Sequence, residues 1–367
     1  MTKKQVSTVR KFATGMFAVL VAGMMSFPSV ALALDSGTVD GNEIANGTAA
    51  NGEGSGGGSW SYDGADTIEL NNFVGGTIQT VGDTIIELEG NNVVEGNVTT
   101  QAGDLTINGD ANVDGADKPS LDVAGSKQIN GDQAITTVGG ISATNMKSGA
   151  SKSESTTVEG KGNLTITDAN VTVSATSGGM SANGGNLTIK DSKVARGAEN
   201  ERLSIYAGSS ASESDKEVLL QGSEIEATSV FSQGTLTIDN TNLTVTPDAN
   251  AQKLIDEGTY EKRGYKWIET AVRAFKGINL KGEQNGEVVL FNDEHGNTWY
   301  YLTTGEDYKV ELKASATPEY WGKTKGMPAT GDTAMPLAFA LGIAAMAAAA
   351  MGVYSFRNRK AEDDSVK

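Results

Sequence analysis

The hydrophobic pattern of the chain is dominated by a short phrase in which two apolar residues flank a threonine. Four copies share the order Gly-x-Leu-Thr-Ile, at residues 103–107, 162–166, 185–189 and 234–238. Successive side chains of a β-strand point to opposite faces, so leucine and isoleucine would face one side and threonine the other. Two copies continue through a polar corner into a second apolar pair, over 164–173 and 236–245. The pattern therefore predicts a repeated unit of strand, bend and strand.

Repetition of this unit predicts an all-β solenoid. Short strand signals bounded by Gly, Asn and Asp continue from residue 62 to residue 250. In a solenoid each coil buries its apolar stripe against the next coil, whereas a two-sheet sandwich supplies strands but no reason for one phrase to recur. The uneven intervals between copies favour a parallel β-helix over 62–250, because its corners tolerate loops of different length. We expect such loops at 146–157 and 196–217.

The segments on either side of 62–250 differ from it in composition. Residues 34–61 are rich in Gly, Ser and Asn and lack a periodic apolar face, which predicts a flexible leader. Residues 251–321 contain a short helical signal at 251–257 and three of the four tryptophans. Two apolar runs within 287–302 flank a turn and predict a hairpin. We expect 251–321 to form a small aromatic-rich β cap that closes the end of the solenoid.

The N-terminal residues 1–33 have the layout of a secretory signal peptide. Four basic residues precede an apolar run from Phe12 to Met25, and small residues follow at Ala31 and Ala33. This order predicts export with cleavage after Ala33, and the alternative is an uncleaved membrane anchor. The apolar run is short for a membrane span, which favours the signal peptide.

The C-terminal region combines a pentapeptide, an apolar segment and a basic stop. The pentapeptide, which ends a linker over 322–331, consists of Met327, Pro328, Ala329, Thr330 and Gly331. The uncharged segment 333–356 is long enough to cross a bilayer as a transmembrane helix, and the tail 357–367 begins with basic residues. This order resembles the cell-wall sorting signal of LPxTG surface proteins of Gram-positive bacteria.

The resemblance to LPxTG proteins implies two partners, a sortase and peptidoglycan. The sortase would cut between Thr330 and Gly331 and join the new carboxyl end to peptidoglycan, while the segment 333–356 holds the chain in the membrane before cleavage. The chain departs from the family at Met327, where leucine is usual, and in the acidic residues 362–364 that follow the basic stop. A single-span membrane protein that is never processed is the alternative. The resemblance thus implies a secreted protein displayed on the cell wall.

Charge and composition narrow the choice of partners. The formal net charge is -17 at pH 7, and residues 34–330 hold 21 basic against 42 acidic residues. A surface of this sign repels nucleic acid and attracts cations. The chain has 46 glycines, typical of turn-rich β structure, and no cysteine, so neither disulfides nor thiolate metal sites are available.

Two further phrases distinguish the first predicted coils. The order Ile-Glu-Leu-x-Gly-x-Asn occupies 86–92, and Gly-x-Leu-Thr-Ile-x-Gly follows at 103–109. In these phrases the chain resembles secreted carbohydrate-binding β-helix proteins related in shape to pectate lyases. The resemblance implies a right-handed parallel β-helix at the cell surface with affinity for glycans, of host or dietary origin.

One acidic segment is a candidate calcium site. Asp110, Asn112 and Asp114 place oxygen ligands at alternate positions before a glycine, and Asp117 is a further ligand candidate. This spacing matches the first half of a calcium-binding loop, but Leu121 stands where such a loop places its bidentate glutamate. A structural role is the alternative, because Asn and Asp favour corners through local hydrogen bonds and the left-handed conformation. Ca²⁺ is therefore the one cofactor that the sequence suggests.

Aromatic residues of the predicted cap are the candidate ligand-binding residues. Flat aromatic faces offer apolar area on which a sugar ring can lie, and Trp267, Trp299 and Tyr301 are the candidates for glycan binding. The alternative is that these side chains form the core of the cap, since a small β unit needs large side chains to bury.

Signals for catalysis are weak in this sequence. Basic residues are scarce across the predicted coils, and no nucleophile elbow, triad order or carboxylate pair stands out. We therefore expect an adhesin or carbohydrate-binding protein without catalytic activity. A surface polysaccharide lyase or hydrolase on the same scaffold is the first alternative, and a structural stalk or coat protein without a specific ligand is the second.

Overall fold

Strands, most of them paired in parallel, are the main regular structure of the described residues. The computed structural model describes residues 33–129, 135–144, 162–208, 215–283, 285–294 and 296–316, all within one compact unit of residues 32–367. Helices are few and short, so the fold is all-β as predicted. The predicted signal peptide up to residue 32, the loop 146–157, the sorting motif and the segment 333–356 lie outside the described residues. Among the residues that the structure describes, no helix is long and apolar enough to cross a membrane.

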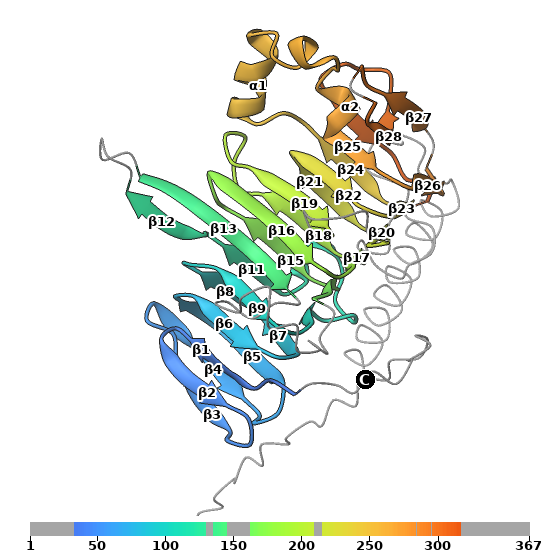
Figure 1. The fold of residues 1–367 in the computed structure, drawn as a ribbon. Coiled ribbons are helices and arrows are strands. Elements are labelled where there is room, and N and C mark those ends of the chain that lie inside the picture. The colour runs from blue at the N-terminus through green and yellow to red at the C-terminus, as the bar shows by residue number, and fades with distance from the viewer. Residues whose placement is uncertain are drawn as a thin grey trace, which may run out of the picture. The chain divides into compact units, whose positions relative to one another are not determined.

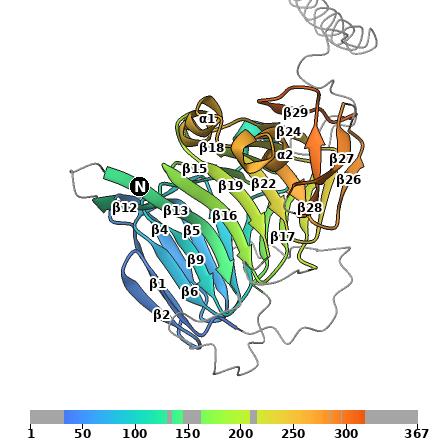
Figure 2. The same cartoon turned by 45° about the horizontal axis from the view of Figure 1, so that its top comes forward.

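The described strands form a twelve-stranded sheet A and a seventeen-stranded sheet B. Sheet A consists, in spatial order, of β2 (Asn42–Ala45), β1 (Ser36–Val39), β6 (Ile78–Val81), β9 (Val98–Gln101), β13 (Ile135–Thr144), β16 (Ser177–Asn183), β19 (Leu203–Ala207), β22 (Ser229–Ser232), β25 (Val272–Ala274), β28 (Thr298–Thr303) and β27 (Glu287–Asn292), and β12 (Ser126–Ile129) pairs with β13. Neighbours from β6 to β25 are parallel, and the pairs at both ends are antiparallel. Figure 2 shows β6, β9, β16, β19 and β22 side by side.

Sheet B contains two rows of parallel strands. The first row is β5 (Thr67–Gly75), β7 (Thr84–Glu89), β10 (Leu105–Asn108), β14 (Leu164–Thr167), β17 (Leu187–Lys190), β20 (Val218–Gln221), β23 (Thr235–Asp239) and β26 (Gly277–Lys281). The second row is β8 (Asn91–Val94), β11 (Ser120–Val123), β15 (Asn170–Val173), β18 (Lys193–Arg196), β21 (Glu224–Ala227) and β24 (Asn242–Val245), with β29 (Val310–Leu312) antiparallel at its end. The strands β3 (Ala50–Glu53) and β4 (Gly57–Tyr62) extend the sheet antiparallel beyond β5.

The chain visits these rows in a fixed order, which defines a coil as one strand of sheet A followed by two strands of sheet B. The strands β16, β17 and β18 form one coil, and β19, β20 and β21 form the next coil beside it (Figure 1). Pairing keeps the repeated phrase in register, with Leu105, Leu164 and Leu187 on successive strands. The leucine and isoleucine of each copy are buried in the core, at 0–1% exposure. The predicted stacking of the repeated phrase is therefore observed.

The first two residues of the phrase act at the corner between sheet A and sheet B. Glycine is required because a Cβ atom on Gly185 would lie 2.3 Å from the carbonyl carbon of Gly162 on the neighbouring coil. The next residue links coils through its side chain: the Asn163 oxygen accepts from the N–H of Asn186 at 2.8 Å. The Asn186 oxygen in turn accepts from the N–H of Glu217 at 3.0 Å. Backbone amides at this corner are thereby satisfied from coil to coil.

The bend between the two strands of sheet B requires one residue in the left-handed region. Asp168, Asp191 and Asn240 occupy this position with φ of 54°, 47° and 47°. Gly90 and Gly222 occupy it in other coils, with φ of 69° and 58°. Asn and Asp tolerate this conformation better than other side chains do, and glycine adopts it without steric cost. This requirement explains the polar corner within the repeated strand, bend and strand unit.

A row of buried hydroxyl groups follows these bends, and we call it the hydroxyl ladder. Ser192 Oγ accepts from the N–H of Ala169 and Ser223 Oγ from the N–H of Ser192, each at 3.2 Å. Thr241 Oγ1 accepts from the N–H of Ser223 at 3.4 Å. Each hydroxyl also donates to the carbonyl two residues before it. Since all three hydroxyl residues are 0% exposed, the ladder supplies the partners that water cannot.

Glu283 closes the hydroxyl ladder at its C-terminal end. Its Oε1 accepts from the N–H of Thr241 at 3.1 Å, in the place where a further coil would supply a hydroxyl. Burial raises the pKa of Glu283 to about 7, although the backbone N–H of Thr241 partly opposes this rise. The C-terminal end of the stacked coils therefore contains a carboxyl group, that of Glu283, whose ionised form is disfavoured by burial.

Residues 34–61 form β1 to β4 and are not the flexible leader that their composition predicts. The strand β1 pairs antiparallel with β6 and β2, and β4 pairs antiparallel with β5 and β3, so the four strands extend the N-terminal end of both sheets. Their anchors are isolated apolar residues that become buried, among them Val39, Ile44 and Trp60. Gly57 and Gly58 adopt φ of 119° and 68° where the chain turns. The glycines therefore mark tight turns, which composition alone does not distinguish from flexibility.

The predicted loop 196–217 contains a strand, β19, and the structure corrects the prediction at this point. Leu203, Ile205 and Ala207 alternate with outward-facing residues and are buried. Charged and serine-rich flanks obscure this alternation in the sequence. The strand completes its coil in sheet A, between β16 and β22.

The C-terminal part begins with three short helices and then rejoins both sheets. The helices are α1 (Ala249–Asp256), η2 (Glu261–Arg263) and α2 (Ile268–Ala271), and a further 3-10 helix, η1 (Gly115–Asp117), lies before β11. The helical signal at 251–257 corresponds to α1, which begins where Asp248 Oδ1 accepts from the N–H of Ala251 at 2.6 Å. The predicted hairpin is confirmed as β27 and β28. Because β25 and β26 pair parallel with the preceding coil, this part continues the sheets.

We predict that removal of one hydroxyl from the ladder destabilises the fold. Ser223→Ala leaves the buried N–H of Ser192 without an acceptor, which costs about 1–3 kcal/mol of unfolding free energy. Urea denaturation of the purified protein measures this loss. Ser59→Ala, at an exposed position of β4, is the matched control and should change stability by less than about 0.5 kcal/mol. Equal stability of the two variants would contradict the role of the ladder.

We also predict a pH dependence of stability that arises from Glu283. Glu283 binds its proton more tightly in the folded protein, where its pKa is about 7, than in the unfolded chain, where its pKa is 4.5. The stabilisation that this group contributes is therefore complete below about pH 4.5 and is lost as the pH rises to about 7. Thermal midpoints recorded across this range should fall more steeply for the wild type than for Glu283→Gln. Parallel curves for the two proteins would refute the assignment.

Candidate functional site

Aromatic side chains line up on the outer face of sheet A, across neighbouring strands. Tyr206 on β19, Phe231 on β22, Arg273 on β25 and Tyr301 on β28 occupy successive positions of one cross-strand row. Their chain neighbours on the same strands point into the core, so these four side chains face outward. The rings of Tyr206 and Phe231 stack with centroids 5.2 Å apart and planes inclined by 21°. We call these four residues the aromatic strip.

Arg273 lies between two aromatic rings. Its guanidinium carbon is 4.8 Å from the ring centre of Phe231 and 5.4 Å from that of Trp299. Burial lowers the pKa of Arg273, yet a guanidinium remains charged at neutral pH. Among the residues that the structure describes, none forms an ion pair or a hydrogen bond with this guanidinium. The strip therefore carries a positive charge that is held by π-systems and not neutralised by a carboxylate.

Small residues continue the row on the N-terminal side of the strip. Ser181 on β16 pairs with Tyr206, and Ser142 on β13 pairs with Ser181. A serine side chain is too small to cover a phenol ring, so the Tyr206 face turned away from Phe231 is open within the row. Tyr206 itself is half-buried, and its hydroxyl bonds to Gln233, which fixes the ring.

Further apolar side chains flank the C-terminal end of the strip. Phe275 is 41% exposed and meets Phe231 edge-on, with ring centres 5.4 Å apart. Phe291 contacts Tyr301 at 6.3 Å between ring centres. Leu290, 52% exposed, pairs with Tyr300 and lies on the other face of the terminal strand β27, so it is not part of this surface. An apolar patch with one embedded cation thus extends over the last strands of sheet A.

The three predicted glycan-binding residues have different positions. Trp267 and Trp299 are each 4% exposed; Trp267 packs in the core cluster, whereas Trp299 lies two residues before Tyr301 and packs against Phe291 and Arg273. Trp299 is further fixed by a hydrogen bond from Nε1 to the carbonyl of Glu269, at 2.6 Å. Neither tryptophan presents a ring face to a sugar in this conformation. Tyr301 is half-buried and belongs to the aromatic strip.

Sequence reasoning missed the remaining members of the strip. Tyr206 falls in the predicted loop 196–217, while Phe231 and Arg273 stand in short strands without a copy of the repeated phrase. When the coils are aligned on the repeated phrase, each coil needs one more strand before the phrase, in sheet A. This missing strand is the sequence signal that could have located Tyr206, Phe231 and Arg273.

The candidate calcium segment forms a loop that is held by its own hydrogen bonds. Asp110 Oδ1 accepts from the N–H of Asn112 at 2.8 Å and from its side-chain amide at 2.9 Å. Asp114 directly precedes the short helix η1 and Asp117 is its last residue, and both are exposed. The described residues contain no group of three or more acidic or histidine side chains placed to hold a metal ion. Calcium binding at this loop stays a prediction.

A buried lysine lies beside the same loop. Lys118, whose side chain is 2% exposed, forms an ion pair with Asp168 at 2.9 Å, and its Nζ is 3.5 Å from the carbonyl oxygen of Asp110. Leu121, at the position of the missing calcium ligand, is buried in β11. The ammonium group of Lys118 thus already interacts with the carboxylate of Asp168 and the carbonyl oxygen of Asp110, oxygen atoms of the kind that bind a calcium ion.

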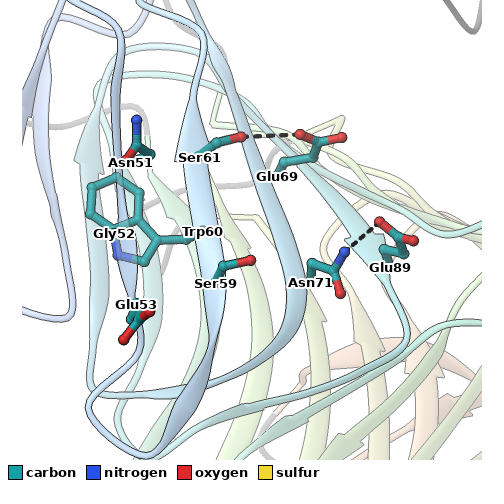
Figure 3. A pocket seen from close by; sticks show the side chains of 9 residues that line it. All are labelled: Asn51, Gly52, Glu53, Ser59, Trp60, Ser61, Glu69, Asn71 and Glu89. Carbon is teal, nitrogen blue, oxygen red and sulfur yellow. Dashed lines mark hydrogen bonds between the residues drawn. The ribbon is translucent and has the colours of Figure 1, made fainter. Parts of the chain in front are cut away.

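A groove of about 450 Å³ lies on the outer face of sheet B near its N-terminal end (Figure 3). It is lined by Asn51, Gly52, Glu53, Ser59, Trp60, Ser61, Glu69, Asn71 and Glu89. Glu69 accepts from the hydroxyl of Ser61 at 3.0 Å, and Glu89 accepts from the Asn71 amide at 2.7 Å. Glu87 pairs with Glu69 on the adjacent strand, and burial raises its pKa. The groove therefore gathers carboxylates and amides on a hydrogen-bonding surface.

The comparisons with known proteins concern the C-terminal region. Residues 322–363 match the family model described as the LPXTG cell wall anchor motif. The chain carries an LPXTG cell wall anchor. The match supports a cell-wall-anchored surface protein that a sortase processes and attaches to peptidoglycan, as the order of pentapeptide, apolar segment and basic stop predicts. No curated protein and no solved structure matches the chain.

The matched range of the LPXTG-anchored protein includes the five residues of its sorting motif, Met327 to Gly331. These residues lie outside the described part of the structure. The described sheets are therefore the portion that the anchor holds at the wall, and the aromatic strip belongs to that portion.

Calcium binding at the loop of this surface protein has a direct test. If Asp110, Asn112 and Asp114 hold Ca²⁺, the midpoint of thermal unfolding is higher in calcium than in chelator, because a ligand that binds only the folded state stabilises it. Asp114→Asn, which keeps the shape of the side chain, should remove this difference. An unchanged midpoint in the wild type removes the calcium hypothesis.

Proposed function

We propose that this wall-anchored protein is a carbohydrate-binding adhesin without catalytic activity, and that it binds glycans along the aromatic strip. The observation that carries the proposal is the outward row of Tyr206, Phe231, Arg273 and Tyr301 on sheet A. Ligand sites combine apolar, often aromatic walls with a few placed polar groups. A row of rings with one cation, bordered by serines, has this composition.

We propose a parallel β-helix as the scaffold of this site. The support is the constant order of one strand in sheet A and two in sheet B, with parallel pairing from β6 to β25. A right-handed sense is expected because crossovers between parallel strands are right-handed in almost all proteins. A scaffold of this kind stacks equivalent positions of successive coils, and a row of similar side chains on its surface follows from that stacking.

The route to the surface is part of the proposal. The signal peptide 1–33 directs export, and the segment 333–356 holds the chain in the membrane until a sortase cuts between Thr330 and Gly331. The coils are then displayed beyond the peptidoglycan, where host or dietary glycans are the accessible partners.

The chemistry of sugars fits the open face of Tyr206. Pyranose rings present an apolar face of C–H groups and a rim of hydroxyls. The apolar face can lie on the uncovered side of the Tyr206 ring, above Ser181. Hydroxyls on the rim can bond to Ser181 and Ser204, which are both half-buried beside the ring. Such contacts bind a sugar without any group placed to break a bond.

The groove on sheet B supports the second candidate function, a surface polysaccharide hydrolase or lyase. Its specific observation is the gathering of Glu53, Glu69 and Glu89 in one groove, with Glu87 beside Glu69. A carboxyl group with a raised pKa, such as Glu87, has the property of a general acid. Turnover of polysaccharides by the purified protein, lost in Glu87→Gln, would establish this alternative in place of simple binding.

We predict that Tyr206→Ala weakens glycan binding about tenfold. Loss of about 50 Å² of apolar contact at about 25 cal/mol per Å² costs about 1.3 kcal/mol, which corresponds to this factor. Titration calorimetry with the oligosaccharides found on a glycan array measures the change. Tyr308→Ala is the matched control, because Tyr308 is 53% exposed and lies outside the strip. Unchanged affinity of a folded Tyr206→Ala protein would exclude the strip as the binding site.

A further inference from the structure

Arg273 is an unusual cation for this protein. Residues 34–330 carry twice as many acidic as basic residues, and the exposed basic side chains on the outer faces of the sheets often meet a carboxylate, as Lys193 meets Glu224 at 2.8 Å. Arg273 instead lies on an outer face between two rings, with no carboxylate partner among the described residues. A guanidinium that is shielded from water and lacks an anion is stabilised when an anion arrives.

The two rings also fix the orientation of the guanidinium. Phe231 and Trp299 lie 4.8 Å and 5.4 Å from its central carbon, and Trp299 is itself held by the hydrogen bond to Glu269. Arg273 is half-buried, so part of the residue is covered by its neighbours and part is exposed to solvent. A guanidinium held in this way offers parallel N–H groups that match the two oxygens of a carboxylate or a sulfate ester.

The row sets the distance between the cation and the open ring. Tyr206 and Arg273 are two strands apart, which corresponds to about 10 Å at the usual spacing of about 4.8 Å. This separation is comparable to two linked sugar units. One unit can therefore lie on Tyr206 while an anionic group of its neighbour reaches Arg273.

The charges near Tyr301 favour a ligand that extends from Arg273 toward Tyr206 over one that extends toward Tyr301. Burial raises the pKa of the Tyr301 hydroxyl, the nearby carboxylates of Glu269 and Glu287 raise it further, and the ammonium group of Lys266 partly opposes them. With two carboxylates and one ammonium group around Tyr301, the local charge is negative and disfavours an anionic sugar placed over this ring. The serines next to Tyr206 carry no charge, and Ser204 accepts a hydrogen bond from Nε of the exposed Arg202 at 3.0 Å, so an anionic ligand that extends from Arg273 toward β16 meets no carboxylate among these residues.

We infer that Arg273 recognises the anionic group, a carboxylate or a sulfate ester, of a glycan whose neighbouring sugar lies on Tyr206. This inference rests on the proposed glycan-binding function and adds the class of ligand to it. The net negative charge of the protein disfavours an anionic ligand in general, so its binding depends on the local cation that the aromatic strip provides, Arg273.

The test compares three oligosaccharide probes on the purified full chain. The probes are a uronic-acid oligosaccharide, its neutral methyl ester and a sulfated neutral oligosaccharide. We expect the wild type to bind at least one charged probe about tenfold or more tightly than the ester, since a good charge-assisted bidentate pair has at least this effect. The charged probe that binds more tightly identifies the anion as carboxylate or sulfate.

The variants separate charge from structure. Arg273→Gln should bind the charged probe and the ester equally, and Arg273→Lys should keep only part of the preference, because an ammonium lacks the planar fork. Arg263→Gln, at an exposed position of η2, is the matched control and should keep the wild-type preference. If Arg273→Gln does not fold, the comparison of probes on the wild type and Arg273→Lys still decides the question.

The outcomes distinguish the inference from the proposal on which it rests. Equal affinity of the wild type for the charged probes and the ester overturns the role of Arg273 and leaves glycan binding in place. A charged-probe preference that persists in Arg273→Gln also overturns it. Failure of the wild type to bind these probes or any glycan on a broad array overturns both.

Discussion

The corner between the two strands of sheet B is the constraint on which the rest of the structure depends. A chain that bends sharply inside a stack of coils must satisfy backbone amides that water cannot reach. In this protein the bend uses a left-handed residue such as Asp191, and the next residue, Ser192, supplies a hydroxyl to the coil before it. Each coil thus needs the following coil to complete its hydrogen bonds. Glu283 supplies the last acceptor, at the cost of a carboxyl group that holds its proton up to about pH 7.

Parallel stacking in register also determines the surface. Equivalent positions of successive coils become neighbours about 4.8 Å apart, however far apart they stand in the sequence. Tyr206, Phe231 and Arg273 come from three different coils and meet only because β19, β22 and β25 pair in this register. The same geometry aligns Glu69 with Glu87 on sheet B. Short strands with little internal pattern can therefore carry extended rows of related side chains.

The row of side chains on sheet A and the row on sheet B differ in charge. The negative charge of the coils keeps a displayed protein soluble and repels polyanions in general. Against this background, the cation on sheet A and the carboxylates on sheet B form two distinct surfaces on one scaffold. The anchor holds the scaffold at the wall, and the loops and rows that face away from the core are the parts available to a ligand.

The sequence by itself determined the all-β class, the stacked phrase, the hairpin at 287–302 and the wall anchor, because each depends on periodicity or on a linear motif. It did not reveal β1 to β4, where isolated residues such as Trp60 find the core only after the glycine turns form. Nor did it locate the aromatic strip, of which only Tyr301 was among the predicted residues. The burial of Trp267 and Trp299 and the partial exposure of Tyr206 depend on neighbours from other parts of the chain. Tertiary structure decided the candidate site, because a cross-strand row exists only when distant segments pair in one register.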